Sequence, residues 1–133
     1  MDAEELARQT ALLKACWAAF DGAMERTASV ELRKGPRGGG RDHARMASHV
    51  VEAEAAYLTQ LGGRRPKTDG PDAASAWSEV RSAVVEAVAV RARGESIEGG
   101  SRVKKPWTPR YFVRRAAWHV LDHAWEIEDR AGA

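Results

Sequence analysis

Four stretches of the chain place apolar residues at alternating spacings of three and four, which is the period of an amphipathic helix. The stretch from Asp2 to Glu25 shows this period most regularly, and its stripe consists of Leu6, Thr10, Leu13, Trp17, Phe20 and Met24. Similar stripes run from Asp42 to Leu61, from Asp72 to just before Gly94, and from Arg110 to Arg130. No stretch alternates as a strand would. The sequence therefore predicts an all-α, four-helix bundle.

Residues that start and stop helices bound these stretches. Asp42 and Asp72 are suited to cap the second and third helices, and Thr108–Pro109 is a strong start signal for the fourth. Gly62–Gly63 and Gly94 are stop signals for the second and third helices. The linkers between helices are long for tight turns, so we expect at least one of them to cross the end of the bundle.

The fourth helix carries large apolar residues around much of its circumference, among them Tyr111 and Phe112. This distribution predicts that it is the most buried helix. We expect tryptophans to act as core anchors, and the chain has five: Trp17, Trp77, Trp107, Trp118 and Trp125. Trp118 and Trp125 also flank a histidine pair and could form the walls of a pocket there.

The length of 133 residues fits one domain, so residues 1–133 are interpreted as a single unit. No apolar run approaches the ~20 residues that span a bilayer, and the acidic start Met1–Glu5 lacks the basic residues of a signal peptide. The only cysteine, Cys16, excludes an internal disulfide framework and is interpreted as a core residue. These features predict a cytoplasmic protein without a membrane partner.

Histidines are the strongest chemical signal, and two of the four, His119 and His123, are four residues apart on the fourth helix. This spacing places both imidazoles on one face with Cβ atoms roughly 6 Å apart, close enough to chelate one ion. Asp122 and Glu126 are acids that could accept a hydrogen bond from the second ring nitrogen of a ligand. The alternative is a pair of histidines that are hydrogen-bonded in a polar patch of the core.

The second helix offers two candidates for a third ligand, His43 and His49, and periodicity does not choose between them. Height along the bundle axis is more informative. His49 is about eight residues from the start of its helix, and His119 and His123 are about eleven and seven residues from the end of theirs. If the two helices are antiparallel, these three imidazoles reach the same height, whereas His43 lies ~9 Å away along the axis. We therefore expect His43 at the surface.

Two segments resemble the DinB/YfiT-like family of metal-binding four-helix bundle proteins. One is RDHARMASHVVEAEAAYLTQLG, residues 41–62, and the other is WTPRYFVRRAAWHVLDHAWEIEDR, residues 107–130, with its HxxxH motif. The resemblance implies an up-down-down-up bundle with one long crossing connection. It also implies a divalent metal ion, zinc or nickel, bound by His49, His119 and His123.

Three neutral imidazoles leave a metal ion its full charge and an open position, as in catalytic sites. Such a site suits hydrolysis by a metal-activated water or attack by the thiolate of a small cofactor thiol. The resemblance extends to mycothiol-dependent isomerases and bacillithiol transferases, and it favours thiol-dependent transfer or isomerisation of a small electrophilic substrate. The alternatives are a metal-dependent hydrolase and a non-catalytic module in which the cluster stabilises the bundle or a homodimer. A ligand from Cys16 or Glu52 would favour the non-catalytic module.

Basic residues surround the glycine-rich connection Gly35–Gly40 and open the fourth helix: Arg33, Lys34, Arg37 and Arg41, then Arg110, Arg114 and Arg115. The first group could bind an anionic substrate or cofactor, but a solvated loop is the preferred interpretation. For the second group, pairing with acidic side chains is the preferred interpretation. Basic residues are dispersed among 19 acids, which argues against a nucleic-acid partner. Ser48 lacks a clear base, so serine catalysis has little support.

Overall fold

The computed structural model describes residues 1–34, 40–67 and 73–132, and these residues form four helices and no strand. α1 spans Ala3–Arg26, α2 spans His43–Gln60, α3 spans Ala73–Ala92 and α4 spans Pro109–Arg130. The all-α prediction is confirmed, and the arrangement is consistent with a four-helix bundle. Among the described helices, none combines the length and apolar character needed to cross a membrane.

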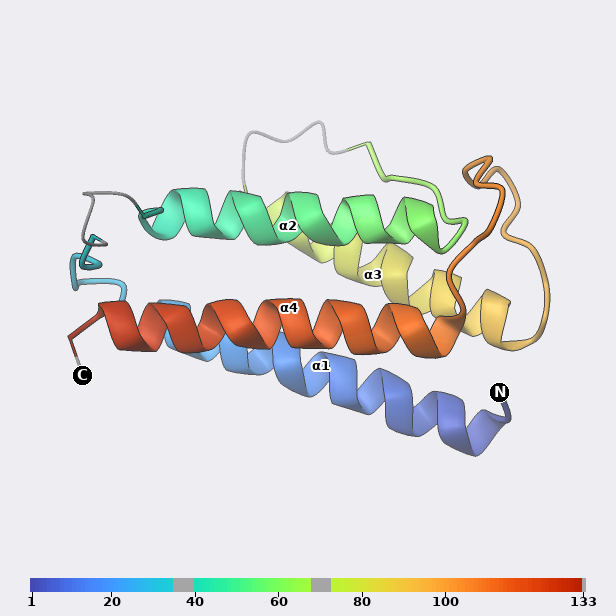
Figure 1. The fold of residues 1–133 in the computed structure, drawn as a ribbon, viewed down its shortest axis with the longest axis horizontal. Coiled ribbons are helices and arrows are strands. Elements are labelled where there is room, and N and C mark those ends of the chain that lie inside the picture. Colours follow the sequence, from blue (N-terminus) through green and yellow to red (C-terminus); the bar gives the residue numbers. More distant parts are fainter. Residues whose placement is uncertain (35–39, 68–72, 133) are drawn as a thin grey trace.

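The helices run in two directions (Figure 1). α1 and α4 run from right to left in this view, and α2 and α3 run from left to right, so the order is up-down-down-up. Ion pairs at both ends of the α1–α4 pair agree with this parallel arrangement, because Glu5 pairs with Arg110 and Arg26 pairs with Glu128. α2 and α4 are therefore antiparallel, as the prediction from histidine height required.

The predicted caps of α2 and α4 are present. Asp42 accepts a hydrogen bond from the backbone N–H of Arg45 at 2.9 Å, and Thr108 accepts one from Tyr111 at 3.1 Å. These bonds satisfy N–H groups that have no partner within the helix. Gly62 has a φ of 94°, a conformation that favours glycine, and it ends α2 as predicted. The predicted cap of α3, Asp72, lies outside the described residues.

The core is built from the predicted stripes. Its largest buried side chains belong to α1, α2, α4 and the residue that follows α2: Leu13, Phe20, Met46, Leu58, Leu61, Phe112 and Ile127. α3 contributes valines, and Trp77 packs against Phe20 with ring centroids 5.1 Å apart. Burial of each large apolar side chain stabilises the fold by about 1.5–3 kcal/mol. Cys16 is buried in this cluster as predicted, and burial raises the pKa of its thiol.

The prediction that all five tryptophans are core anchors was wrong for two of them. Trp118 and Trp125 are 57% and 55% exposed. They occupy the same face of α4 as Tyr111, because the three are seven residues apart, and this face points away from α1 and α2. α4 is therefore exposed along this face, whereas Phe112 and Ile127 on its other faces are fully buried.

A buried carboxyl group, which the sequence did not reveal, lies among α1, α2 and α3. Glu54 of α2 is 2% exposed and accepts a hydrogen bond from the Trp17 indole of α1. The guanidinium of Arg81, from α3, lies 5.1 Å from the Trp17 ring centroid and 4.2 Å from that of Trp77. Asp21 accepts two hydrogen bonds from Arg81 at 2.7 and 2.9 Å. Burial raises the pKa of Glu54 to about 7, although the Trp17 hydrogen bond and the Arg81 charge both act to lower it.

We expect Glu54→Gln to remove a pH-dependent loss of stability. Because the folded-state pKa of Glu54 is raised, the folded protein holds a proton that the unfolded chain releases, so stability falls as pH rises from about 4.5 to about 7. At 1.36 kcal/mol per pKa unit, this shift corresponds to a loss of about 3 kcal/mol in the free energy of unfolding. The amide that replaces the carboxyl group keeps an acceptor for Trp17 and carries no charge. Urea unfolding at several pH values across this range should therefore show that the free energy of unfolding falls in the wild type more than in the variant.

The exposed acid Glu52 on the same helix provides the control, because Glu52→Gln makes the same side-chain change outside the core. If the stability of the two variants depends on pH in the same way, the burial of Glu54 is not the cause of the pH-dependent loss of stability.

Candidate metal centre

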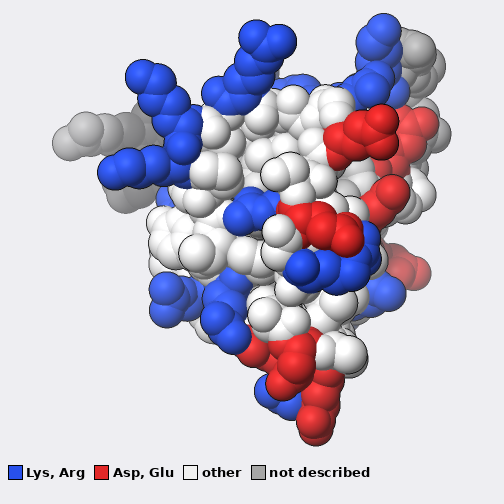
Figure 2. Space-filling model, turned by 90° about the vertical axis from the view of Figure 1, so that its right-hand side faces the viewer, with Lys and Arg blue, Asp and Glu red and all other residues white. Residues whose placement is uncertain are grey.

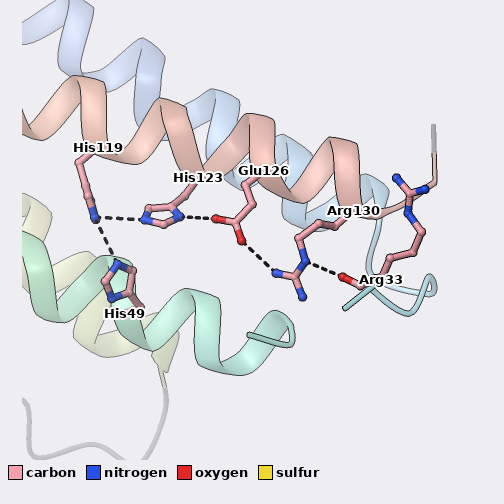
Figure 3. A network of polar contacts seen from close by, with 6 residues as sticks. All are labelled: Arg33, His49, His119, His123, Glu126 and Arg130. Carbon is pink, nitrogen blue, oxygen red and sulfur yellow. Dashed lines mark hydrogen bonds and ion pairs between the residues drawn. The ribbon is translucent and has the colours of Figure 1, made fainter. Parts of the chain in front are cut away.

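His49, His119 and His123 come together between α2 and α4, as the sequence predicted. Each of the three offers one ring nitrogen, and these nitrogens all lie within 4.8 Å of one another. His119 and His123 are on one face of α4, and His49 faces them from the middle of α2 because the two helices are antiparallel. Figure 3 shows the three imidazoles turned toward a common point.

The separations of the His119 nitrogen from the other two match those of ligands around one small ion. The Nε2 atoms of His49 and His119 are 3.3 Å apart, and those of His119 and His123 are 3.2 Å apart. Nitrogens bound ~2.05 Å from a tetrahedral zinc ion lie about 3.3 Å from one another. The ring planes are also inclined, at 55° for His49 and His119 and at 77° for His119 and His123. Two of the three separations therefore match a shared ion, and the third pair, His49 and His123, lies within 4.8 Å.

A chain of polar contacts orients the third imidazole (Figure 3). The Nδ1 atom of His123 lies 2.9 Å from Oε1 of Glu126, and the other oxygen of Glu126 accepts a hydrogen bond from Arg130 at 3.1 Å. Arg130 in turn donates to the backbone carbonyl of Arg33 at 2.7 Å. A carboxylate on Nδ1 favours the tautomer with its proton there, which leaves the Nε2 lone pair free for a ligand bond. Of the two acids named from the sequence, Glu126 has this role, whereas Asp122 is exposed.

The surroundings of the cluster favour the neutral form of two of its imidazoles, those of His119 and His49. Burial lowers the pKa of His119 to about 4, and the nearby His123, His49, Arg115 and Arg41 lower it further. Burial also lowers the pKa of His49, again with a contribution from Arg41. Metal ligation requires the neutral ring, so these shifts prepare the site for a cation near neutral pH.

The other residues considered as ligands lie elsewhere. His43 is at the start of α2, where its Nε2 lies 2.9 Å from the hydroxyl of Thr27, so it is not part of the cluster. Glu52 pairs with Arg65, and Cys16 is in the apolar core. Within the described part of the chain, the cluster therefore consists of three histidines without a fourth protein ligand.

A different set of aromatic residues from the expected one borders the cluster. Trp118 and Trp125 are exposed, and the bordering ring is Tyr57, whose centroid is 5.6 Å from that of His119. Tyr57 packs on Trp107 at 5.5 Å, which in turn packs on Tyr111 at 4.9 Å. Helix geometry could have identified the error, because consecutive residues on a helix point about 100° apart, so Trp118 cannot face the same way as His119.

The basic residues of the two predicted groups differ in their contacts. Arg110 pairs with Glu5, as expected. Arg114 and Arg115 instead lie over aromatic rings, those of Tyr111 and Tyr57, at 5.9 and 5.5 Å from the ring centroids. Arg33 anchors its segment to α4 through hydrogen bonds to the end of that helix, and residues 35–39, which include Arg37, lie outside the described residues.

Comparison of the chain with family models, with curated proteins and with solved structures found no match.

The pKa of His119 gives a direct test of this geometry in metal-free protein. We expect the His119 ring protons to titrate with a midpoint near pH 4, far below the ~6.5 of an exposed histidine, because the ring is buried among other cations. NMR titration of ring C–H signals, with His119→Gln to assign the resonance, measures it. A midpoint near the ordinary value would mean that the ring is not enclosed between α2 and α4.

Proposed function

We propose that His49, His119 and His123 bind a divalent metal ion, zinc or nickel, and that the site catalyses thiol-dependent transfer or isomerisation of a small electrophilic substrate. In this proposal the chain is a DinB/YfiT-like protein. The observation that carries the proposal is the cluster of three ring nitrogens within 4.8 Å of one another, with Nε2 of His119 3.3 Å from that of His49 and 3.2 Å from that of His123, and no fourth protein ligand among the described residues. Three-ligand sites of this kind are typical of catalytic rather than structural zinc.

When bound, such an ion supplies a Lewis acid that lowers the pKa of a thiol or a water at the open position. The chain's own residues supply the rest. The two histidines of α4 and the one of α2 fix the position of the reacting group, and Glu126 holds the ring of His123 in the ligating tautomer. Tyr57 covers one side of His119 and limits the access of water there.

In the transfer, the thiolate sulfur forms a bond to an electrophilic carbon of the substrate. The leaving group departs with the electrons of the broken bond, and the thiol proton passes to solvent. The resemblance in residues 41–62 and 107–130 favours this reaction over hydrolysis. The up-down-down-up helix order and the antiparallel placement of α2 and α4 also support the family assignment (Figure 1). The single unpaired cysteine, Cys16, supports a reducing cytoplasm as the location of this activity.

The second candidate is a module in which the histidine cluster only stabilises the bundle or a homodimer. The observation in its favour is the contact chain from His123 through Glu126 and Arg130 to the backbone of Arg33, because it ties α4 to the segment after α1. A structural metal ion would normally have four protein ligands. The missing fourth ligand is therefore what favours the enzyme.

Substitution of single histidines tests the ligand set. We expect His49→Ala, His119→Ala and His123→Ala each to abolish stoichiometric zinc or nickel binding, because two imidazoles hold these ions far more weakly than three. His43→Ala is the matched control on α2 and should bind normally. Metal content of protein purified without a histidine tag, together with isothermal titration, measures this. Loss of metal only in the His43 variant would remove His49 from the site.

Cobalt substitution tests the open position. We expect a low-molecular-weight thiol to produce a sulfur-to-cobalt charge-transfer band in the near ultraviolet, because its thiolate ligates the ion directly. The same thiol should then be consumed with an electrophile such as an alkyl halide. A cobalt-loaded protein that responds to no cellular thiol but hydrolyses esters or amides would support the hydrolase. A protein with neither response would support the non-catalytic module.

A further inference from the structure

One face of α4 carries a row of exposed aromatic side chains. Tyr111, Trp118 and Trp125 are spaced by seven residues, so they follow one another along the helix in nearly the same direction. Their exposed fractions are 40%, 57% and 55%. They leave roughly 300 Å² of aromatic surface in water, because a whole aromatic side chain presents about 150–250 Å². A patch of this size, the aromatic face of α4, is often an interaction site.

A surface hollow of about 310 Å³ lies within this row, between Tyr111 and Trp118. Arg114 and Arg115 form its other two walls. These four residues are at positions i, i+3, i+4 and i+7 of the helix, which is the arrangement of the holes that receive single side chains in coiled coils. The guanidinium of Arg114 lies 5.9 Å from the centre of the Tyr111 ring, and that of Arg115 lies over Tyr57. The hollow therefore suits a short acidic side chain from another helix.

The charged residues of this face are arranged for an antiparallel copy of the same helix. Arg114 lies four residues before Trp118, and the exposed Asp122 lies four residues after it. Both point within about 40° of Trp118, since consecutive residues turn by about 100°. When two such helices pack in opposite directions about Trp118, Asp122 of each comes to the height of Arg114 of the other. Tyr111 and Trp125 meet in the same way, because each is seven residues from Trp118.

Other arrangements fit the charges less well. Parallel helices would place Arg114 against Arg114 and Asp122 against Asp122, and both contacts are repulsive. The end of the bundle where α1 and α4 begin is not a surface of a single sign, since Figure 2 shows both acidic and basic side chains there. Glu5 and Arg110 form an ion pair at this end. The charges therefore favour a second copy as the occupant of the aromatic face.

We propose that the aromatic face of α4 binds a second copy of this chain, with the two α4 helices antiparallel and a twofold axis at Trp118. Asp122 of each copy then enters the hollow between Arg114 and Arg115 of the other, and both guanidinium groups donate to its carboxylate. The interface is isologous, so each contact occurs twice. The aromatic area is smaller than the ~800 Å² per partner of a standard interface, so we expect a dissociation constant in the micromolar range. The dimer does not use the histidine cluster and does not depend on the proposed metal centre.

Sedimentation velocity over a series of protein concentrations measures the dimer, and far-ultraviolet circular dichroism checks that each variant is folded. We expect Trp118→Ala to raise the dissociation constant at least about thirtyfold, because a central tryptophan is a typical anchor of an interface. Leu12→Ala is the matched control, since Leu12 is 52% exposed on α1, and it should dimerise like the wild type. Wild-type protein that stays monomeric up to roughly 1 mM would overturn the proposal. Equal effects of the two substitutions would overturn it as well.

Charge reversal tests the antiparallel order. Arg114→Asp places carboxylates against Asp122 of the other copy, and Asp122→Arg places guanidinium groups against Arg114, so each should weaken the dimer at least about tenfold. The double variant Arg114→Asp/Asp122→Arg restores both pairs in reverse and should recover most of the affinity. An equimolar mixture of the two single variants should also dimerise, because every contact then joins opposite charges. Arg8→Asp makes the same substitution at an exposed site of α1 and should have no effect. A double variant no stronger than the single variants would overturn the antiparallel dimer.

Discussion

The antiparallel packing of α2 against α4 is the constraint on which the rest of this structure depends. It brings His49 to the height of His119 and His123, although His49 and His119 are 70 residues apart in sequence. It also places the ring of Tyr57 beside the imidazole of His119. Reversal of α2 about its midpoint would move His49 along the axis by about five residues, which is ~7.5 Å and more than one helical turn. The direction of these two helices comes from the up-down-down-up order, so the site is a property of topology as much as of side-chain chemistry.

Burial shifts pKa values in opposite directions at the two polar clusters and favours the neutral form at both. At the histidine cluster it lowers the pKa of His119, which keeps a base neutral and able to donate a lone pair. At Glu54 it raises the pKa of a carboxyl group to about 7, which keeps an acid neutral. In each cluster, a nearby carboxylate contacts one of the basic side chains. Glu126 orients His123, whereas Asp21 neutralises Arg81 beside Glu54.

Much of the fold could be predicted from the sequence, because periodicity and capping residues act locally. The caps at Asp42 and Thr108 needed only a few neighbouring residues. The histidine triad could be predicted because height along a helix follows from residue number. The Glu54 cluster could not, because Trp17 and Arg81 come from two other helices and nothing in the local sequence links them to it. The exposure of Trp118 was missed because the prediction considered how many apolar residues the fourth helix carries and not which side of the helix each of them faces.

The parallel α1–α4 pair has a consequence for how the chain folds during synthesis. Of these four helices α1 emerges from the ribosome before the others, yet its main partner is the fourth, and α2 and α3 are completed in between. The apolar side chains of α1, such as Phe20, cannot be fully covered before then. Such non-local pairing slows folding and leaves apolar surface open to aggregation. A nascent chain stalled before α4 would expose this surface and would also lack two of the three histidines.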